Sequence, residues 1–294
     1  MNNIIKSRIS IFLFSIIISY LLSDVYENIL GFILILSIGV IHGANDLLII
    51  KNYTLNKSIK GQFLYFFYYV SIVLLGFLFF YVLPALALVS FILISIYHFG
   101  EQYWEVNLRN TKINRTNKLF LIISHGLIFF ITIFMNNLIT VNEVLTSFNF
   151  IELNYSSLLI AISLFLFIYI FILLKFKNLR KFLLNEILFF FLLFILTINA
   201  TLIYGFAIYF IFFHSILSIK DQVRFIYNDD SKENIRNYIK ISLPYFFLAL
   251  SFLFVFYFTI DLEKINLLQI LFTFIAAITF PHVIVIEKMY RHMK

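Results

Sequence analysis

The sequence predicts an all-α protein, a polytopic bundle of about ten transmembrane helices, and composition, hydropathy and run length support this fold class. Hydrophobic residues make up 62% of the 294-residue chain and charged residues only 13%, with a mean hydropathy of +0.99. Soluble domains are roughly 45–50% apolar and about 25% charged. A water-soluble domain of this length could not bury so many Phe, Ile and Leu side chains. We therefore expect a single integral membrane domain over residues 1–294.

Ten apolar runs are separated by charged or polar segments. Most have about 18–22 residues, the length that crosses ~30 Å of hydrocarbon at ~1.5 Å per residue. The runs cover residues 9–23, 29–50, 62–82, 84–104, 119–140, 157–174, 182–199, 201–219, 241–260 and 266–287. Lys6 and Arg8 resemble the start of a signal peptide, but no small-residue cleavage site follows, which favours an uncleaved first span. The apolar stretch 182–219 is divided by a predicted turn at 199–201.

The basic residues predict the orientation of the spans. With a cytoplasmic N-terminus, six segments face the cytoplasm, and they contain every Lys and Arg except Lys264. Cytoplasmic loops of membrane proteins carry this excess of positive charge. Both termini are therefore predicted to be cytoplasmic. The net charge of +7 follows from this topology, which leaves little reason to expect nucleic-acid binding.

Five of the six histidines lie inside predicted spans at similar depth. His42, His98, His125, His214 and His282 are each six to eleven residues from a basic flank, or about 9–17 Å along a helix. For one histidine alone, an interhelical hydrogen bond is the simpler interpretation. Five at matched depth favour a shared metal or proton site, because ionisable groups inside a membrane normally serve a function. The sixth histidine, in the basic tail, is expected to be solvated.

Two of these histidines have a carboxylate about one helical turn away. Asp46 is four residues after His42, and Glu101 is three residues after His98, with Gln102 next to it. These spacings predict that each pair shares one helical face. Such side chains commonly hold the second nitrogen of a metal-bound imidazole. The chain has no cysteine, and imidazoles without thiolates suit Fe, Zn, Cu or Ni, so these residues leave the metal open.

Four segments carry a resemblance to a known family. They are GVIHGANDLLI (39–49), YHFGEQ (97–102), FFHSILSIKDQ (212–222) and FPHVIVIEK (280–288). In this order and among comparable apolar spans, the chain resembles the bacterial membrane β-carotene 15,15′-dioxygenases of the Brp/Blh type. The resemblance implies an enzyme that uses Fe(2+) and O2 to cleave the central double bond of β-carotene into two molecules of retinal.

The resemblance also implies a set of iron ligands, which carries over to His42, His98 and His214. The family's fourth histidine, four residues after the HS pair, is replaced here by Ser218. We expect His282 to be the fourth ligand, because it lies at the right depth and follows a proline that frees a carbonyl one turn earlier. His125 is the reserve candidate. Around the ligands, the side chains expected to support them are Asp46, Glu101, Gln102, His125 and Ser218.

A hydrocarbon substrate dissolved in the lipid bilayer suits an intramembrane site that it enters sideways. Aromatic residues near the histidines are expected to line a polyene tunnel, although ordinary packing explains each one singly: Tyr97, Phe99, Tyr103, Trp104, Tyr209, Phe212 and Phe213. By analogy with the family, a retinal-binding rhodopsin is the expected product acceptor. The expected location is the bacterial inner membrane.

Two other classes of function compete with this interpretation. A transporter of divalent cations or protons would use the same His, Asp and Glu residues. The outer half of the spans offers little besides Asn136, Asn137 and Asn199 to continue such a path. A structural or assembly protein would leave the matched depth of the histidines unexplained.

Overall fold

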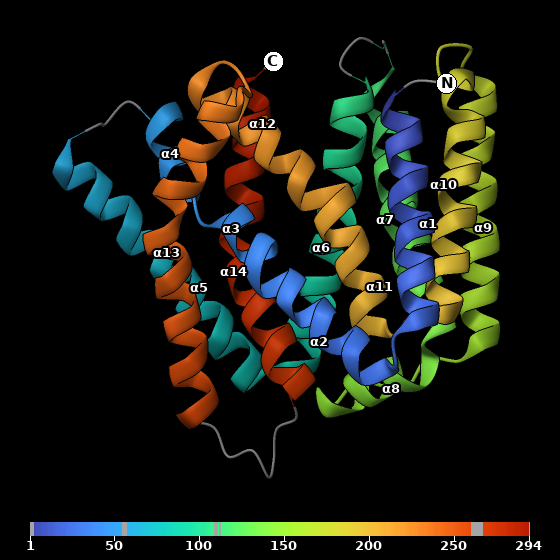
Figure 1. Cartoon of the computed structure of the whole chain (residues 1–294), viewed down its shortest axis with the longest axis horizontal. Coiled ribbons are helices and arrows are strands. Elements are labelled where there is room, and N and C mark those ends of the chain that lie inside the picture. Colours follow the sequence, from blue (N-terminus) through green and yellow to red (C-terminus); the bar gives the residue numbers. More distant parts are fainter. Residues whose placement is uncertain (1–2, 55–57, 109–110, 112, 260–266, 294) are drawn as a thin grey trace. The chain divides into compact units, whose positions relative to one another are not determined.

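The computed structural model is all-helical over the residues it describes, which are 3–54, 58–108, 111, 113–259 and 267–293 (Figure 1). Nine helices in this described part are long and apolar enough to cross a membrane, and a shorter apolar helix covers Ser7–Leu21. These helices confirm the predicted polytopic bundle of about ten spans. The orientation stays a prediction, and Lys57, Arg109, Lys112, Asp261, Glu263, Lys264 and Lys294, used to assign it, lie outside the described residues.

The helices follow the ten apolar runs closely. Their bounds are α1 (Asn3–Leu21), α2 (Asp24–Leu34), α3 (Val40–Gly43), α4 (Asp46–Tyr53), α5 (Ile59–Val82), α6 (Pro84–Leu108), α7 (Arg115–Asn136), α8 (Leu138–Ser147), α9 (Tyr155–Lys175), α10 (Arg180–Asn199), α11 (Leu202–Ile208), α12 (Ile216–Tyr227), α13 (Lys232–Thr259) and α14 (Leu267–His292). Two π-helical segments, η1 (Ile35–Gly39) and η2 (Tyr209–Ser215), complete the order. The short helix α8 is an addition that the sequence analysis did not predict.

The turn predicted at 199–201 is confirmed. Helix α10 ends at Asn199 and α11 begins at Leu202. Thr201 caps α11, because its hydroxyl accepts a hydrogen bond from the Tyr204 amide at 3.3 Å. The Thr201 amide in turn donates to Glu27 Oε2 of α2 at 2.7 Å, so a buried carboxylate receives a backbone N–H that the turn leaves without a helical partner.

The chain forms two compact units, which are described separately. Unit 1 contains residues 1–35, 95–143 and 151–214, and unit 2 contains residues 36–94, 144–150 and 215–294. Four of the five boundaries fall within α6, α8, η1 and η2, and the fifth lies between α8 and α9. The single membrane domain expected over 1–294 stays a prediction.

In unit 1, α7 packs against α9, α10 and α11, while α1 packs against α10 and α2 against α11. Helices α6 and α7 approach each other closely at two glycines. A Cβ atom on Gly100 would lie 1.9 Å from the carbonyl oxygen of Ile122, and one on Gly126 would lie 2.0 Å from that of Ile96. Small residues let membrane helices approach until their backbones touch. The two glycines thus set the spacing of the helices that carry His98 and His125.

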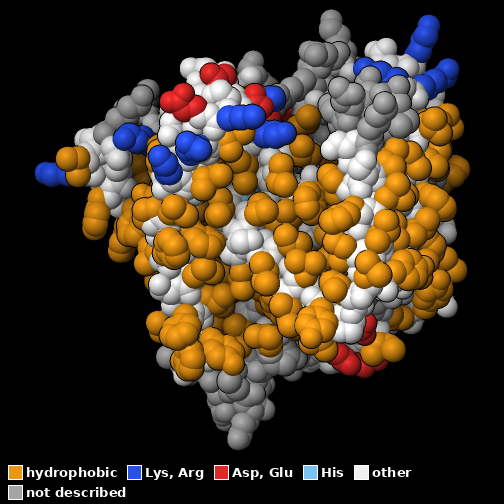
Figure 2. Space-filling view, in the orientation of Figure 1, with side chains coloured by type: hydrophobic (Ala, Val, Ile, Leu, Met, Phe, Trp, Pro, Cys, Tyr) orange, Lys and Arg blue, Asp and Glu red, His pale blue; other side chains and the backbone are white. Residues whose placement is uncertain are grey.

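In unit 2, α14 packs against α3, α4 and α5, and α12 packs against α3, α4 and α13. A buried apolar cluster of α4 and α14, containing Ile49, Ile286 and Met289, joins two of these helices. Figure 2 shows hydrophobic side chains over the sides of the helices. Unit 2 has many large hydrophobic side chains that are exposed, Phe67 of α5 and Phe254 of α13 among them, as expected for contact with lipid.

The spans that carry His42 and His214 depart from regular α-helix. Segment η1 ends three residues before His42, and η2 contains His214. Single π-helical turns often occur at functional sites. The second span is also interrupted at Ala44–Asn45, so His42 and Asp46 lie on two consecutive short helices, α3 and α4. His98 and Glu101 do lie on one uninterrupted helix, α6.

Candidate metal site

The buried polar groups of unit 2 are centred on His282, which α14 carries one residue after Pro281. Helix α14 continues through this proline to His292. His282 Nδ1 lies 2.8 Å and 3.0 Å from the two carboxylate oxygens of Asp46, which begins α4. Tyr69 of α5 donates its hydroxyl to Asp46 Oδ2 at 2.8 Å. Because a carboxylate only accepts hydrogen bonds, this contact places the His282 proton on Nδ1 and directs a lone pair out of Nε2.

His42 faces that second nitrogen. Its Nε2 lies 2.8 Å from His282 Nε2, and the two rings meet edge to face with centroids 4.4 Å apart. The break at Ala44–Asn45 does not separate His42 from Asp46 functionally, because both contact the same His282 ring. Both histidines are almost completely buried. Two imidazole nitrogens therefore point toward each other inside the bilayer-spanning part of unit 2.

A network on α12 and α13 holds His42 from the other side. Gln222 Nε2 donates to the His42 carbonyl at 3.1 Å and to Ser218 Oγ at 3.1 Å, and it lies 3.3 Å from His42 Nδ1. Tyr238 donates its hydroxyl to Gln222 Oε1 at 2.6 Å. Ser218 thus occupies the place next to Gln222, where its hydroxyl accepts a hydrogen bond.

In unit 1, His98 and His214 form a second pair. Their ring centroids are 4.7 Å apart at an interplanar angle of 74°, and each offers a ring nitrogen within 4.8 Å of the other. Gln102 of α6 donates to the backbone carbonyl of His214 at 2.8 Å, which ties α6 to η2. Phe99 packs its ring 4.5 Å from that of His214. Glu101 Oε1 accepts a hydrogen bond from the hydroxyl of Tyr97, one turn earlier, at 2.8 Å.

His125 belongs to a separate cluster of unit 1. Its Nδ1 lies 3.3 Å from the Tyr169 hydroxyl and its Nε2 lies 3.0 Å from the Tyr209 hydroxyl. Its ring stacks on Tyr103 with centroids 4.0 Å apart. Both nitrogens therefore face tyrosine hydroxyls within unit 1, whereas His282 keeps Nε2 for another imidazole.

A buried carboxylate organises the same cluster. Glu186 of α10 accepts hydrogen bonds from the hydroxyls of Tyr103 and Tyr169. Arg8 of α1 donates to the Tyr103 hydroxyl at 2.9 Å and lies over its ring. We call His125, Tyr103, Tyr169, Tyr209, Glu186 and Arg8 the His125 cluster. An acidic and a basic group inside a membrane are expected to be hydrogen-bonded in this way.

Several of these residues were not predicted from the sequence. Gln222, Tyr238 and Tyr69 contact the predicted histidines or Asp46, and each is an ordinary residue of its helix. Glu186 had a detectable signal, because it is the one carboxylate in the apolar run 182–199. Of the aromatic residues predicted to line a tunnel, Tyr103 and Tyr209 belong to the His125 cluster, and Phe213 stacks on Phe12 at 4.6 Å. Their role in substrate binding stays a prediction.

The donor set fits a metal ion. Two imidazole nitrogens at ~2.1 Å from one ion and at right angles to each other are about 3 Å apart, close to the His42–His282 separation of 2.8 Å. Asp46 on His282 Nδ1 is the usual carboxylate partner of a metal-bound histidine. Gln222 Nε2 lies 3.3 Å from His42 Nδ1 and donates to the His42 carbonyl, so Gln222 fixes the position of the His42 ring.

Comparison with known proteins gives one result. Residues 33–290 match the family model described as β-carotene 15,15′-dioxygenase. The match contains all five histidines of the spans, together with Asp46, Gln222 and Glu186. No curated protein sequence and no solved structure matches the chain significantly.

Proposed function

The chain belongs to the β-carotene 15,15′-dioxygenase family, and on this premise we propose that it cleaves the central double bond of β-carotene with O2 to give two molecules of retinal. The family match over 33–290 carries the proposal, because it spans every segment that contributes a buried histidine. The histidine pairs within each unit support it. They supply nitrogen donors without thiolates, a set that suits iron.

The proposed ligands of Fe(2+) are His42, His98, His214 and His282. The iron would supply the activation of O2. Asp46 would hold the proton of His282 at Nδ1, and Gln222 would position the His42 ring. His125 has both nitrogens on tyrosine hydroxyls, which favours His282 as the fourth ligand in place of the family's histidine at position 218.

The protein itself would bind and orient the substrate and exclude water from the site. The four proposed ligands are at most 4% exposed, so water has little access to their nitrogens. The site would lie in the cytoplasmic half of a bacterial inner membrane, as the depth of the histidines predicts. β-Carotene would arrive from the bilayer, and a retinal-binding rhodopsin would accept the product.

The test uses membranes of β-carotene-producing cells that express the chain. In 18O2, each retinal should carry one labelled oxygen, provided that the aldehyde is reduced to retinol at once to prevent exchange with water. His98→Ala should abolish retinal formation and lower the iron content of the purified protein. His292→Ala is the matched control, because this exposed ring stacks on Tyr53 and is not a proposed ligand.

Full retinal formation by His98→Ala would overturn the proposed site. Absence of retinal from a well-expressed wild-type chain would overturn the proposed reaction. Metal-dependent uptake of a divalent cation by the same membranes would then support transport instead.

A further inference from the structure

An apolar cavity of about 350 Å³ lies in unit 2, beside the pair His42 and His282. Its walls come from α5, α13 and α14, and α3 and α4 close one end. Ligand pockets in proteins usually hold roughly 300–1,000 Å³. The lining reaches from Phe66 to Phe77 on α5, which is about 16 Å at ~1.5 Å per residue. The cavity is therefore elongated along a helix and suits an extended chain.

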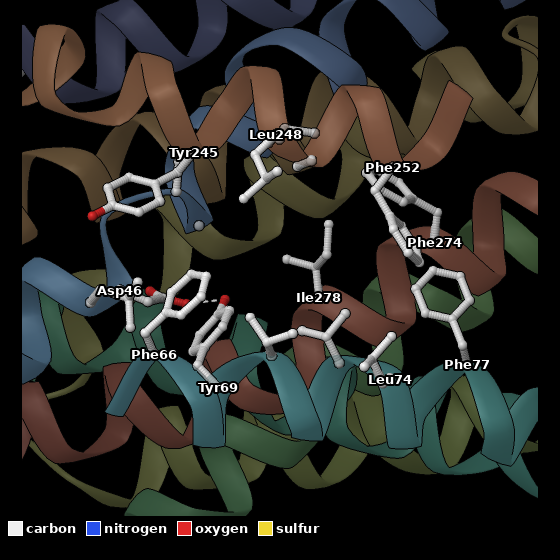
Figure 3. A pocket seen from close by; sticks show the side chains of 17 residues that line it. Asp46, Phe66, Tyr69, Leu74, Phe77, Tyr245, Leu248, Phe252, Phe274 and Ile278 are labelled. Carbon is white, nitrogen blue, oxygen red and sulfur yellow. Dashed lines mark hydrogen bonds between the residues drawn. The ribbon is translucent and has the colours of Figure 1, made fainter. Parts of the chain in front are cut away.

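The two ends of the cavity differ in chemistry (Figure 3). One end holds Phe66 together with the polar side chains Asp46, Tyr69 and Tyr245, and the Tyr69 hydroxyl donates to Asp46. At the other end lie the rings of Phe77, Phe252 and Phe274. Phe77 and Phe252 pack with centroids 5.0 Å apart. An occupant with a bulky hydrocarbon ring at one end and a slender chain fits this gradient better than a polar molecule does.

The polar end adjoins the proposed ligands. Asp46, which lines the cavity, holds His282 Nδ1. Ile278, also in the lining, precedes His282 by one turn of α14. Gly43 lies between the cavity and the ring, because a Cβ atom there would be 3.7 Å from Ile278 Cγ2 and 3.8 Å from His282 Nδ1. The polar end of the cavity is therefore next to His282, with Gly43 and Asp46 between the cavity and the ring.

The side of the cavity is bounded by helices that face lipid. Leu74 of α5 and Leu248 of α13 line it and are 51% and 56% exposed. A hydrocarbon in the bilayer can reach the interior between these two helices without crossing water. This lateral route matters for a substrate that is insoluble in water.

We propose that this cavity binds one half of the carotenoid substrate, with the terminal ring among Phe77, Phe252 and Phe274 and the polyene running along α5 toward Asp46 and His282. The proposal rests on the proposed function, which supplies a substrate with two identical ring-bearing halves. The volume lies near the lower limit for ligand pockets, which suits half of the molecule better than the whole. A lipid acyl chain is the competing occupant, and it has no ring to pack against Phe77, Phe252 and Phe274.

The test fills the cavity from α5 with Val73→Trp. The matched control on the same helix is Val82→Trp, because Val82 is 59% exposed and outside the cavity lining. Protein is purified in detergent from β-carotene-producing cells without oxygen, so that bound substrate is not consumed. Carotenoid and phospholipid per protein are then measured. Val73→Trp should retain at least tenfold less β-carotene than wild type, and Val82→Trp should retain the wild-type amount.

A second variant guards against misfolding. Ala249→Leu fills the opposite wall on α13 with a smaller side chain and should lower retention at least threefold at an unchanged thermal midpoint. Equal β-carotene in wild type, Val73→Trp and Ala249→Leu overturns the proposal, as does loss of phospholipid alone. If wild type forms no retinal but retains more β-carotene than Val73→Trp, the proposed reaction is overturned and the proposed binding site is supported.

Discussion

Two buried histidines, His282 in unit 2 and His125 in unit 1, differ in how their nitrogens are used. His125 has a tyrosine hydroxyl at each nitrogen and an aromatic ring stacked on its face. His282 has a carboxylate at Nδ1 and another imidazole at Nε2, next to an apolar cavity. Burial and the depth predicted from the sequence are alike, so neither separates a ligand from a structural histidine. The contact partners of the two ring nitrogens distinguish the two roles. When nitrogens of two different imidazoles face each other, as in His42 and His282, they can share one proton or bind one metal ion.

The largest expected effect is that of His282→Ala. It removes a proposed iron ligand and leaves Asp46 without its imidazole partner, so retinal formation should fall at least a hundredfold and iron content should fall with it. Metal analysis of the purified protein and retinal assay of the membranes measure both. Wild-type levels of retinal and iron in His282→Ala would show that His282 is not an iron ligand. The fourth ligand would then be His125, or the site would have three ligands.

Asp46→Asn should have the next largest effect. The amide no longer accepts a charge-assisted hydrogen bond from His282 Nδ1, and loss of such a partner typically lowers metal affinity ~10–100-fold. Titration of the apoprotein with Fe(2+) under anaerobic conditions measures this affinity. Affinity equal to that of wild type would mean that Asp46 only fills space beside His282.

His125→Ala should act on stability and leave specific activity unchanged. It removes contacts to Tyr169 and Tyr209 and opens a cavity, at a cost of about 2–4 kcal/mol. The thermal midpoint in detergent should fall by roughly 5–10 °C. Loss of iron from folded His125→Ala protein would contradict the structural role and favour a role as ligand.

The smallest effect is expected for Asp230→Asn in the loop between α12 and α13. The hydrogen bond from Arg224 holds the pKa of this exposed carboxyl below its usual range. Any stability that the ion pair adds is therefore present near neutral pH and is lost as pH falls through the lowered pKa. Because exposed ion pairs contribute little, retinal formation and thermal midpoint should match wild type at neutral pH. A clear loss of activity would show that this loop contributes to the site.

The spans could be predicted from sequence because hydropathy and length report directly on the cost of placing a segment in lipid. Even the charge-free turn before Leu202 was predicted from span length and loop parity. The break at Ala44–Asn45 and the π-helical segments were not, because each changes the pattern of backbone hydrogen bonds inside an apolar run without changing the hydropathy of that run. The candidate histidines were found for the opposite reason, since an imidazole in such a run stands out.

The sequence by itself determined the class of protein, its family and which ionisable residues lie within the spans. Tertiary structure decided their partners. It paired His282 with Asp46 and His42, gave His125 to the tyrosines and Glu186, and placed Gly43 beside an apolar cavity. These contacts join helices far apart in the chain, and hydropathy is a local property that carries no information about which helix lies beside which. Only the packing of the helices determined which group each imidazole nitrogen contacts.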